Sequence, residues 1–166
     1  AFSMIPSAGV AIVTPTDYTP PPGGLAIRRE LDFVEQERRM HLYKRDAMLA
    51  YLRANKLNRI VTQGGKTPRI GIATVGKSYL DVQQALADLG IDEVRANDLG
   101  IRLFKLACPW PIDPAELKAF ADGLDLIIVV EEKRSLIEAQ LKDHLFSQRQ
   151  RPMRIGKKDE DGRERF

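Results

Sequence analysis

Cysteine and histidine are scarce in this chain, and their scarcity excludes several kinds of site. The only cysteine is Cys108, so an intrachain disulfide is impossible and the four thiolates that usually hold an iron–sulfur cluster are missing. The two histidines, His41 and His144, lie far apart without companion ligands. The sequence therefore predicts no cofactor and no metal site in this segment, because zinc sites need several closely spaced ligands.

Long hydrophobic runs and charge of one sign are also absent. The 26 basic and 23 acidic residues are interleaved and leave a net charge of +3. The densest basic run, Arg149–Lys158, is typical of a solvated tail and not of the concentrated patch that nucleic-acid binders carry. No run is long enough to span a bilayer, and no signal peptide is recognisable. We expect a cytoplasmic protein that binds neither membrane nor nucleic acid.

The ends of the chain predict linkers around one domain. Residues 1–27 contain five prolines followed by Gly23 and Gly24, which favours an extended connector, with a possible short strand at Val10–Val13. Residues 28–156 have the composition of a globular α/β domain, and residues 157–166 form a polar linker. The absent initiator methionine suggests that the chain is a piece of a longer protein.

Between the linkers, β-prone runs alternate with amphipathic runs. The predicted strands are Leu57–Thr62, Arg69–Val75, Ile101–Ala107, Leu126–Val130 and Met153–Ile155. The predicted helices are Glu30–Asn55, Ser78–Leu89, one that begins after Asp113 and one that begins after Ser135. Asn55 is expected to end the first helix in a left-handed conformation, and Gly90 to end the second.

Helix starts and inward faces follow from local patterns. Asp113 with Pro114 and Glu116 is a capping box, and Ser135 with Glu138 is another. The side chains expected to face the core are Tyr79, Val82, Leu86 and Leu89 in one helix, and Leu117, Phe120, Ala121 and Leu124 in the next. The wholly apolar strand Leu126–Val130 implies that helices cover both of its faces. These features predict a three-layer α/β/α fold with a mostly parallel five-stranded sheet.

Gly71–Ser78 reads GIATVGKS and matches the phosphate-binding pattern G-x-x-x-x-G-K-[ST]. A phosphate-binding loop needs its first glycine beyond the end of a strand, where backbone N–H groups can turn towards the anion. Here Ile72, Thr74 and Val75 are β-branched, and only two residues separate Gly71 from Pro68. We therefore interpret the segment as a strand and keep a small nucleotide-binding α/β protein as the alternative.

Candidate site residues lie where two parallel strands end. Gly76, Lys77 and Ser78 follow one strand, and Glu131 and Glu132 follow another. Ligands and interfaces of open α/β sheets gather at this edge, so we regard these five residues as rim candidates for binding. The competing interpretation is an exposed turn and solvated strand-end charges. Cys108, beside Pro109, is expected to be a small buried filler without an activating base.

Several segments together resemble one enzyme family. These are TVGKSYLDVQQALADLGI, GIRLFKLACPWPIDPAELKAFADGL and LIIVVEEKRSLIEAQLKDHLF, with the flanking PPPGGLAIR and GKKDEDG. They resemble the second domain of the indolepyruvate ferredoxin oxidoreductases, part of the 2-oxoacid:ferredoxin oxidoreductase family. More broadly, they resemble the transketolase C-terminal domain of thiamine-dependent enzymes. The resemblance covers nearly the whole chain.

The resemblance implies that the chain is a structural and interface domain, inactive alone, of an enzyme that decarboxylates aryl 2-oxo acids. The parent enzyme would use thiamine diphosphate, Mg²⁺ and iron–sulfur clusters, pass electrons to ferredoxin and form an acyl-coenzyme A. Its other domains and subunits would be this domain's partners, with a pyrimidine-binding domain before the connector. The family also implies that the first strand runs antiparallel to the others. No residue matches the family's catalytic motifs, so no catalytic residue is assigned.

A third interpretation is a stand-alone signalling module of flavodoxin-like shape. It is the least favoured of the three, because the early strand ends lack the acidic pocket that a phosphoacceptor site would need.

Overall fold

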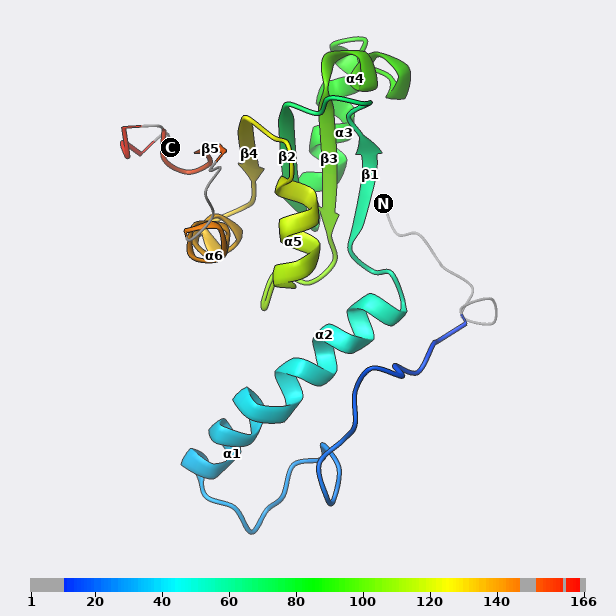
Figure 1. Ribbon diagram of the computed structural model, residues 1–166. Helices are drawn as coiled ribbons and strands as arrows, with labels where there is room; N and C mark the ends of the chain where they lie inside the picture. The colour runs from blue at the N-terminus through cyan, green and yellow to red at the C-terminus, as the bar shows by residue number, and fades with distance from the viewer. Residues whose placement is uncertain (1–10, 147–151, 160, 165–166) are drawn as a thin grey trace. The chain divides into compact units, whose positions relative to one another are not determined.

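The structure is a computed structural model, and it describes residues 11–146, 152–159 and 161–164. The chain divides into two compact units, residues 1–56 and residues 57–166, which are treated separately below (Figure 1). No helix in the described ranges is long and apolar enough to cross a membrane.

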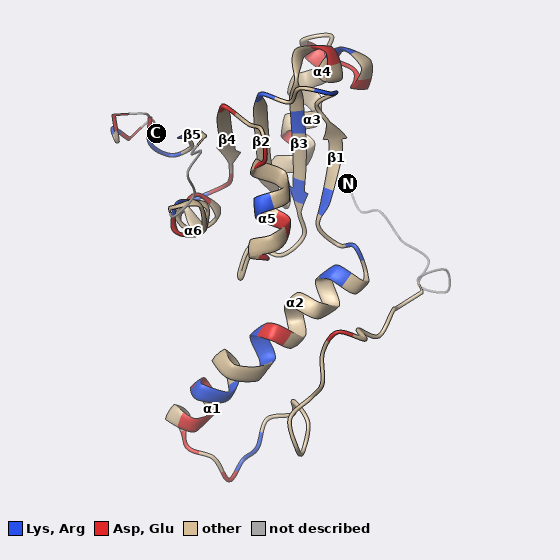
Figure 2. Cartoon of the chain, in the orientation of Figure 1, with Lys and Arg blue, Asp and Glu red and all other residues tan. Residues whose placement is uncertain are grey.

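The first unit is an extended segment followed by one continuous helical stretch. Its parts are α1 (Phe33–Arg39), the π-helix η2 (Met40–Lys44) and α2 (Arg45–Ala54). Asp32 caps α1, since its Oδ1 accepts a hydrogen bond from the backbone N–H of Glu35 at 2.8 Å. Basic and acidic residues are interspersed along these helices (Figure 2).

Two predictions for this unit, a left-handed Asn55 and a short strand at Val10–Val13, are wrong, and the Asn55 side chain is involved in both. Asn55 has φ −95°, and the left-handed residue is Lys56 with φ 49°. The Asn55 amide instead pairs with the backbone of Val13, accepting from its N–H at 2.8 Å and donating to its carbonyl at 2.9 Å. Residues 11–13 therefore form no strand, and Val10 lies outside the described residues.

The second unit is built on a five-stranded mixed sheet. Its strands are β1 (Arg59–Gln63), β2 (Ile70–Val75), β3 (Ile101–Leu106), β4 (Leu126–Val130) and β5 (Met153–Ile155). They lie in the order β1-β3-β2-β4-β5. β1 runs antiparallel to β3, and every other neighbouring pair is parallel. The predicted mostly parallel sheet with one antiparallel first strand is confirmed.

Helices complete three layers. α3 (Ser78–Asp88) contacts β2 and β4, and α4 (Glu93–Leu99) contacts β1 and β3. α5 (Pro114–Ala121) and α6 (Leu136–Leu145) pack together on the other face (Figure 1). α4 was missed in the sequence, although Asp92 caps it and Gly100 ends it with φ 74°.

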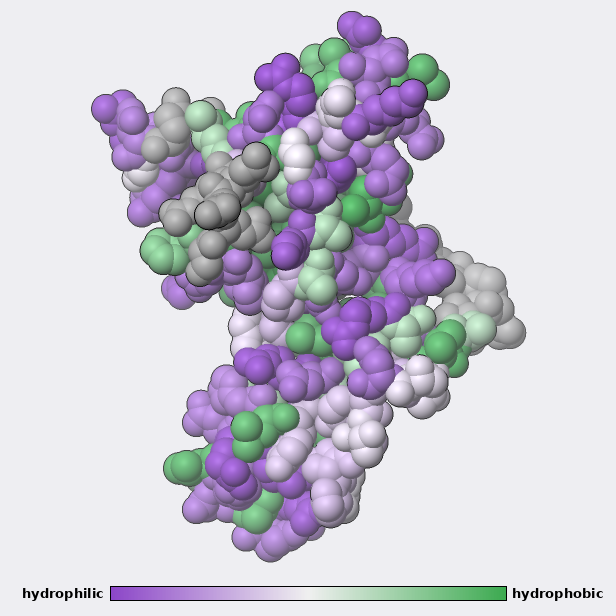
Figure 3. Space-filling view, viewed as in Figure 1, coloured by the Kyte–Doolittle hydropathy of each residue, from purple (hydrophilic) through white to green (hydrophobic). Residues whose placement is uncertain are grey.

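The main core lies between the sheet and the α5/α6 layer. All four side chains predicted to face inward from α5 and its end are buried there. The rings of Phe104 and Phe120 stack with centroids 4.9 Å apart. Burial of each such ring contributes about 2–3 kcal/mol. On the face seen in Figure 3, hydrophilic residues predominate and hydrophobic ones form separate spots.

The α3/α4 face is covered less completely than predicted. Leu89 is 72% exposed, because α3 ends at Asp88 and the chain turns away at Gly90. In β4, Ile127 and Val129 are buried, whereas the residues of the opposite face are only half-buried. The apolar run in β4 predicted that helices cover both of its faces fully, whereas the α3/α4 face is covered only in part.

Candidate functional site

The segment that matches a phosphate-binding pattern is a regular strand. β2 pairs residue by residue with β3, from Ile70 opposite Ile101 to Val75 opposite Leu106. A Cβ on Gly71 would lie 2.4 Å from Leu124 Cδ1 and within 2.7 Å of the Phe120 ring. Gly71 is thus required by close packing, and the nucleotide-binding alternative is not supported, because Ile70–Val75 forms a strand where that motif needs a loop.

A hollow of about 480 Å³ lies at the edge of the sheet where β2 and β4 end. Of the five rim candidates, Gly76, Lys77, Glu131 and Glu132 line it. Ser78 does not line it, and is buried at the first position of α3. The other residues that line the hollow are Val75, Pro109, Lys133, Arg134 and Leu136.

Glu131 is a helix cap as well as a rim residue. It is 8% exposed, and its carboxylate accepts the backbone N–H groups of Leu136, Ile137 and Glu138 at 2.9, 2.8 and 3.1 Å. Negative charge at a helix N-terminus is favourable because unpaired N–H groups and the helix dipole meet there. Glu131 therefore holds the amino end of α6 against the end of β4.

This arrangement corrects the capping box predicted at Ser135. The Ser135 side chain makes no cap hydrogen bond. Glu138 is buried, and it accepts from Lys142 Nζ at 2.6 Å and from the backbone N–H of Lys157 at 2.9 Å. The local pattern was misleading because Glu131, the residue that follows β4, already accepts the N–H groups of the helix terminus.

Lys77 and Gly76 form the opposite wall of the hollow. Lys77 Nζ contacts both carboxylate oxygens of Asp81 at 2.8 and 2.7 Å. Hydrogen bonding to Asp81 raises the pKa of Lys77, and the charge of Glu132 adds to this. Gly76 has φ 58°, and a Cβ there would meet nothing within 4 Å, so its backbone faces open space.

The proline-rich corner after β3 lies next to the hollow. Pro109 lines it, and Trp110 is 43% exposed. Cys108 is half-buried, so the prediction of a buried filler is wrong, and its Sγ lies 3.0 Å from the Trp110 carbonyl oxygen. No acidic or histidine side chain is hydrogen-bonded to Cys108 among the described residues.

The hollow thus combines an apolar floor with a charged rim. Lys133, which directly follows Glu132, was expected on this rim from the sequence, whereas Arg134 was missed. Within the described ranges, no group of three or more His, Cys, Asp or Glu residues could hold a metal. An apolar centre with a polar rim is the usual anatomy of a protein–protein contact. Ligand binding by the five rim candidates stays a prediction.

Comparisons with known proteins agree on one family. A family model described as "Indolepyruvate oxidoreductase domain" matches residues 59–166. "Indolepyruvate oxidoreductase subunit IorA" of Pyrococcus horikoshii is 36% identical over 84 residues, which are 51% of this chain and 12% of that protein. The subunit of the same name from Thermococcus kodakarensis is 35% identical over 80 residues, 48% of this chain and 11% of that protein. The matching part of the chain therefore covers only about a ninth to an eighth of the length of these relatives.

One solved structure has a similar fold. It is the 2-oxoglutarate:ferredoxin oxidoreductase from Magnetococcus marinus with 2-oxoglutarate, coenzyme A and succinyl-CoA bound. The alignment has a TM-score of 0.50 at 20% identity, and it covers 74% of this chain and 20% of that one.

Proposed function

Because the chain belongs to the indolepyruvate oxidoreductase domain family, we propose that it is a structural and interface domain of a 2-oxoacid:ferredoxin oxidoreductase. The complete enzyme would oxidatively decarboxylate indolepyruvate or a similar aryl 2-oxo acid to an acyl-coenzyme A and pass the electrons to ferredoxin. The family match to residues 59–166, nearly all of the second unit, carries this proposal. The names of the two archaeal relatives support the choice of substrate.

The chain's own residues do not fit the cofactors of such an enzyme. Cys108 is the only thiol, whereas an iron–sulfur cluster takes about four thiolates. The described residues offer no carboxylate cluster for Mg²⁺, and the buried Glu131 and Glu138 carboxylates are used in capping and in binding Lys142. Thiamine diphosphate, Mg²⁺ and the clusters would therefore be held by other parts of the enzyme, and this domain would be inactive alone.

In this proposal the hollow at the carboxyl edge is a contact with another domain or subunit. Leu136 and Pro109 offer apolar surface, and Lys133 and Arg134 offer charge at the rim. Gly76, Lys77, Ser78, Glu131 and Glu132 would then shape or support this contact. Residues 1–27 would connect the domain to a preceding pyrimidine-binding domain, residues 28–156 would form the domain, and residues 157–166 would lead onwards. The enzyme would work in the cytoplasm.

Charge reversal at the hollow tests the proposal in the complete gene product with its partner subunit. The assay is indolepyruvate- and coenzyme A-dependent reduction of methyl viologen, with thermal unfolding measured in parallel. The double variant Lys133→Glu/Arg134→Glu should lose about tenfold in activity at unchanged thermal stability, because a partner surface that complements Lys133 and Arg134 would be acidic and would then meet like charges. The matched control is Arg95→Glu, at an exposed position away from the hollow, and it should keep full activity.

Two results would contradict the proposal. If the purified complete protein shows no indolepyruvate-dependent reduction, the assigned reaction is wrong. If the hollow variant is as active as the Arg95 control, the hollow is not a contact that the enzyme needs.

A further inference from the structure

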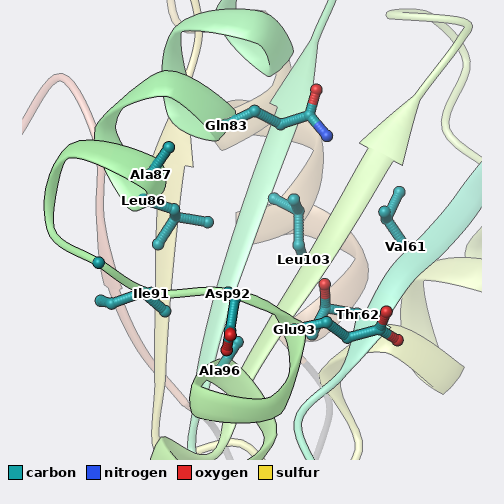
Figure 4. Close-up of a pocket in the computed structure, with 11 residues that line it drawn as sticks. Val61, Thr62, Gln83, Leu86, Ala87, Ile91, Asp92, Glu93, Ala96 and Leu103 are labelled. Atoms are coloured by element: carbon teal, nitrogen blue, oxygen red, sulfur yellow. The ribbon is translucent and has the colours of Figure 1, made fainter.

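A second hollow lies on the other side of the domain, on the α3/α4 face. It measures about 550 Å³ and runs between α3, the α3–α4 connection and β1 (Figure 4). Its floor is Leu103 of β3 with Ala96 of α4, both 3% exposed. Leu86, Ile91 and Val61 form its apolar walls (Figure 4). This groove is distinct from the carboxyl-edge hollow, since the two share no lining residue.

The groove marks a place where the helical layer is incomplete. α3 contacts β2 and β4 and reaches β3 only at its first turn, where Lys105 Nζ lies 4.7 Å over the Tyr79 ring, whereas α4 contacts β1 and β3. α4 has seven residues, a length of about 10 Å, and it lies at the end of the sheet where β3 begins (Figure 1). Sheets of this class bury both faces under helices. Between α3 and α4, the strip over β1 and Leu103 of β3 is therefore left as an open groove that no helix of the described residues fills.

The shape of β1 favours a helix over an added strand as the missing element. The register between β1 and β3 shifts between Ile60 and Thr62, so Val61 is an extra, unpaired residue. A bulge of this kind twists a strand and disfavours pairing along its free edge. Val61 is 37% exposed and lines the groove, so it offers side-chain contact instead.

Charge specifies the occupant further. Asp92 and Glu93 lie at the mouth of the groove, and the set of described residues that line it contains no lysine or arginine. One oxygen of Asp92 accepts from the Arg95 N–H at 2.8 Å, whereas Glu93 extends across the mouth towards Thr62 (Figure 4). A partner with a basic residue at this end would complement the groove.

We infer that the groove receives an amphipathic helix, apolar on one face and carrying a lysine or arginine beside Glu93, from another domain or subunit of the complete enzyme. This inference rests on the proposed role as an interface domain. It adds a second contact and the chemistry of the element that makes it, a helix laid into an apolar groove.

Adjacent glutamines allow a matched test. Gln83 lines the groove, whereas the neighbouring Gln84 is exposed outside it and donates a hydrogen bond to Asp88 at 2.8 Å. The photo-crosslinking amino acid benzoylphenylalanine is placed at either position in the complete gene product, purified with its partner subunit. After irradiation, adducts are mapped by mass spectrometry. Position 83 should label a helical peptide that contains lysine or arginine, and position 84 should not.

Charge variants then probe the basic contact. Glu93→Lys should lower the yield of the position 83 adduct about fivefold, and the neutral Glu93→Gln about twofold, because the first adds repulsion and the second only removes attraction. Equal yields for both variants would overturn the predicted basic residue. The inference that a helix occupies the groove would be overturned if position 83 gave no adduct, or gave an adduct with a second copy of residues 1–166. A small molecule that stays bound in the groove through purification would overturn it as well.

The viologen assay is run on the same samples. An adduct of the expected kind in a protein without indolepyruvate activity would refute the proposed reaction and leave the groove assignment standing. An active enzyme without the adduct would leave the proposed reaction standing and refute the groove assignment.

Discussion

Replacing Glu131 with alanine would remove the carboxylate that binds the amino end of α6. Three backbone N–H groups would lose their acceptor, those of Leu136, Ile137 and Glu138. The neighbouring Glu132 is exposed, so Glu132→Ala is a control of the same chemistry one residue away. The pair separates the capping role of Glu131 from a general effect of removing negative charge at this rim.

The magnitude follows from which N–H groups can reach water. Leu136 is exposed, so its N–H can bind solvent, but Ile137 and Glu138 are buried. Two buried unpaired donors cost about 3 kcal/mol of unfolding free energy, which corresponds to a fall of about 10 °C in Tm for a unit of this size. Glu131→Gln keeps one acceptor oxygen and loses the charge, so it should cost about 1 kcal/mol. Glu132→Ala should stay within about 0.5 kcal/mol of the parent.

Trp110 makes the measurement specific to the second unit. It is the only tryptophan, and its corner is tied to α6 because Gln140 donates to the Pro109 carbonyl at 2.8 Å and accepts from the Ile112 N–H at 2.9 Å. Urea unfolding of the 166-residue chain followed by tryptophan fluorescence therefore reports on the region that Glu131 supports. Equal losses for Glu131→Ala and Glu132→Ala, or no loss for either, would refute the capping argument.

Three further predictions concern packing, a helix end and an ion pair. Gly71→Ala should destabilise the second unit by about 2 kcal/mol in urea unfolding, because the added methyl group would overlap Leu124. Arg102→Lys should cost about 1–2 kcal/mol in the same assay, because the guanidinium bridges the last carbonyl groups of α5 to the β1 backbone. The pKa of Asp17 lies below its ordinary value because Arg53 donates to it, so Arg53→Gln should raise that pKa in a carboxyl NMR titration.

Each of these predictions has its own control. For Gly71, the double variant Gly71→Ala/Leu124→Ala should lose less than the sum of the single losses, since the overlap disappears, and strict additivity would contradict the packing explanation. For Arg102, the exposed Arg95→Lys should be neutral. For Asp17 the lowered pKa means that the ion pair contributes above the unfolded-state pKa and is lost as the pH falls through the folded-state pKa. A pKa of Asp17 unchanged by Arg53→Gln would refute the pairing.

Short-range patterns in the sequence were enough to predict most elements. All five strands lie within two residues of their predicted bounds, and the Asp113 cap and the buried stripe of α5 are confirmed. The β-branched residues after Gly71 correctly indicated a strand in place of a phosphate loop. These features depend on periodicity and on side chains that bind neighbouring backbone, so a window of a few residues contains the information.

Two local predictions failed because a group outside the predicted motif made the decisive hydrogen bonds. Ser135 has the residue type and spacing of a cap, but Glu131 reaches the helix first. Asn55 has the residue type of a left-handed stop, but its amide binds Val13, 42 residues earlier. In both cases the local preference is worth about 1 kcal/mol, so two or three well-placed hydrogen bonds to another group are enough to override it.

The sequence alone determined the alternation of strands and helices, and hence a layered, mostly parallel sheet, because each element carries its own apolar period. The family resemblance added the antiparallel first strand. Only the tertiary structure decided that the rim predicted at the ends of β2 and β4 is a hollow that also includes Arg134, Pro109 and Leu136, and that a groove stays open between α3 and α4 over β1 and Leu103. Both depend on which strands become neighbours and on how far each helix extends across the sheet. These are long-range distances that no local pattern encodes.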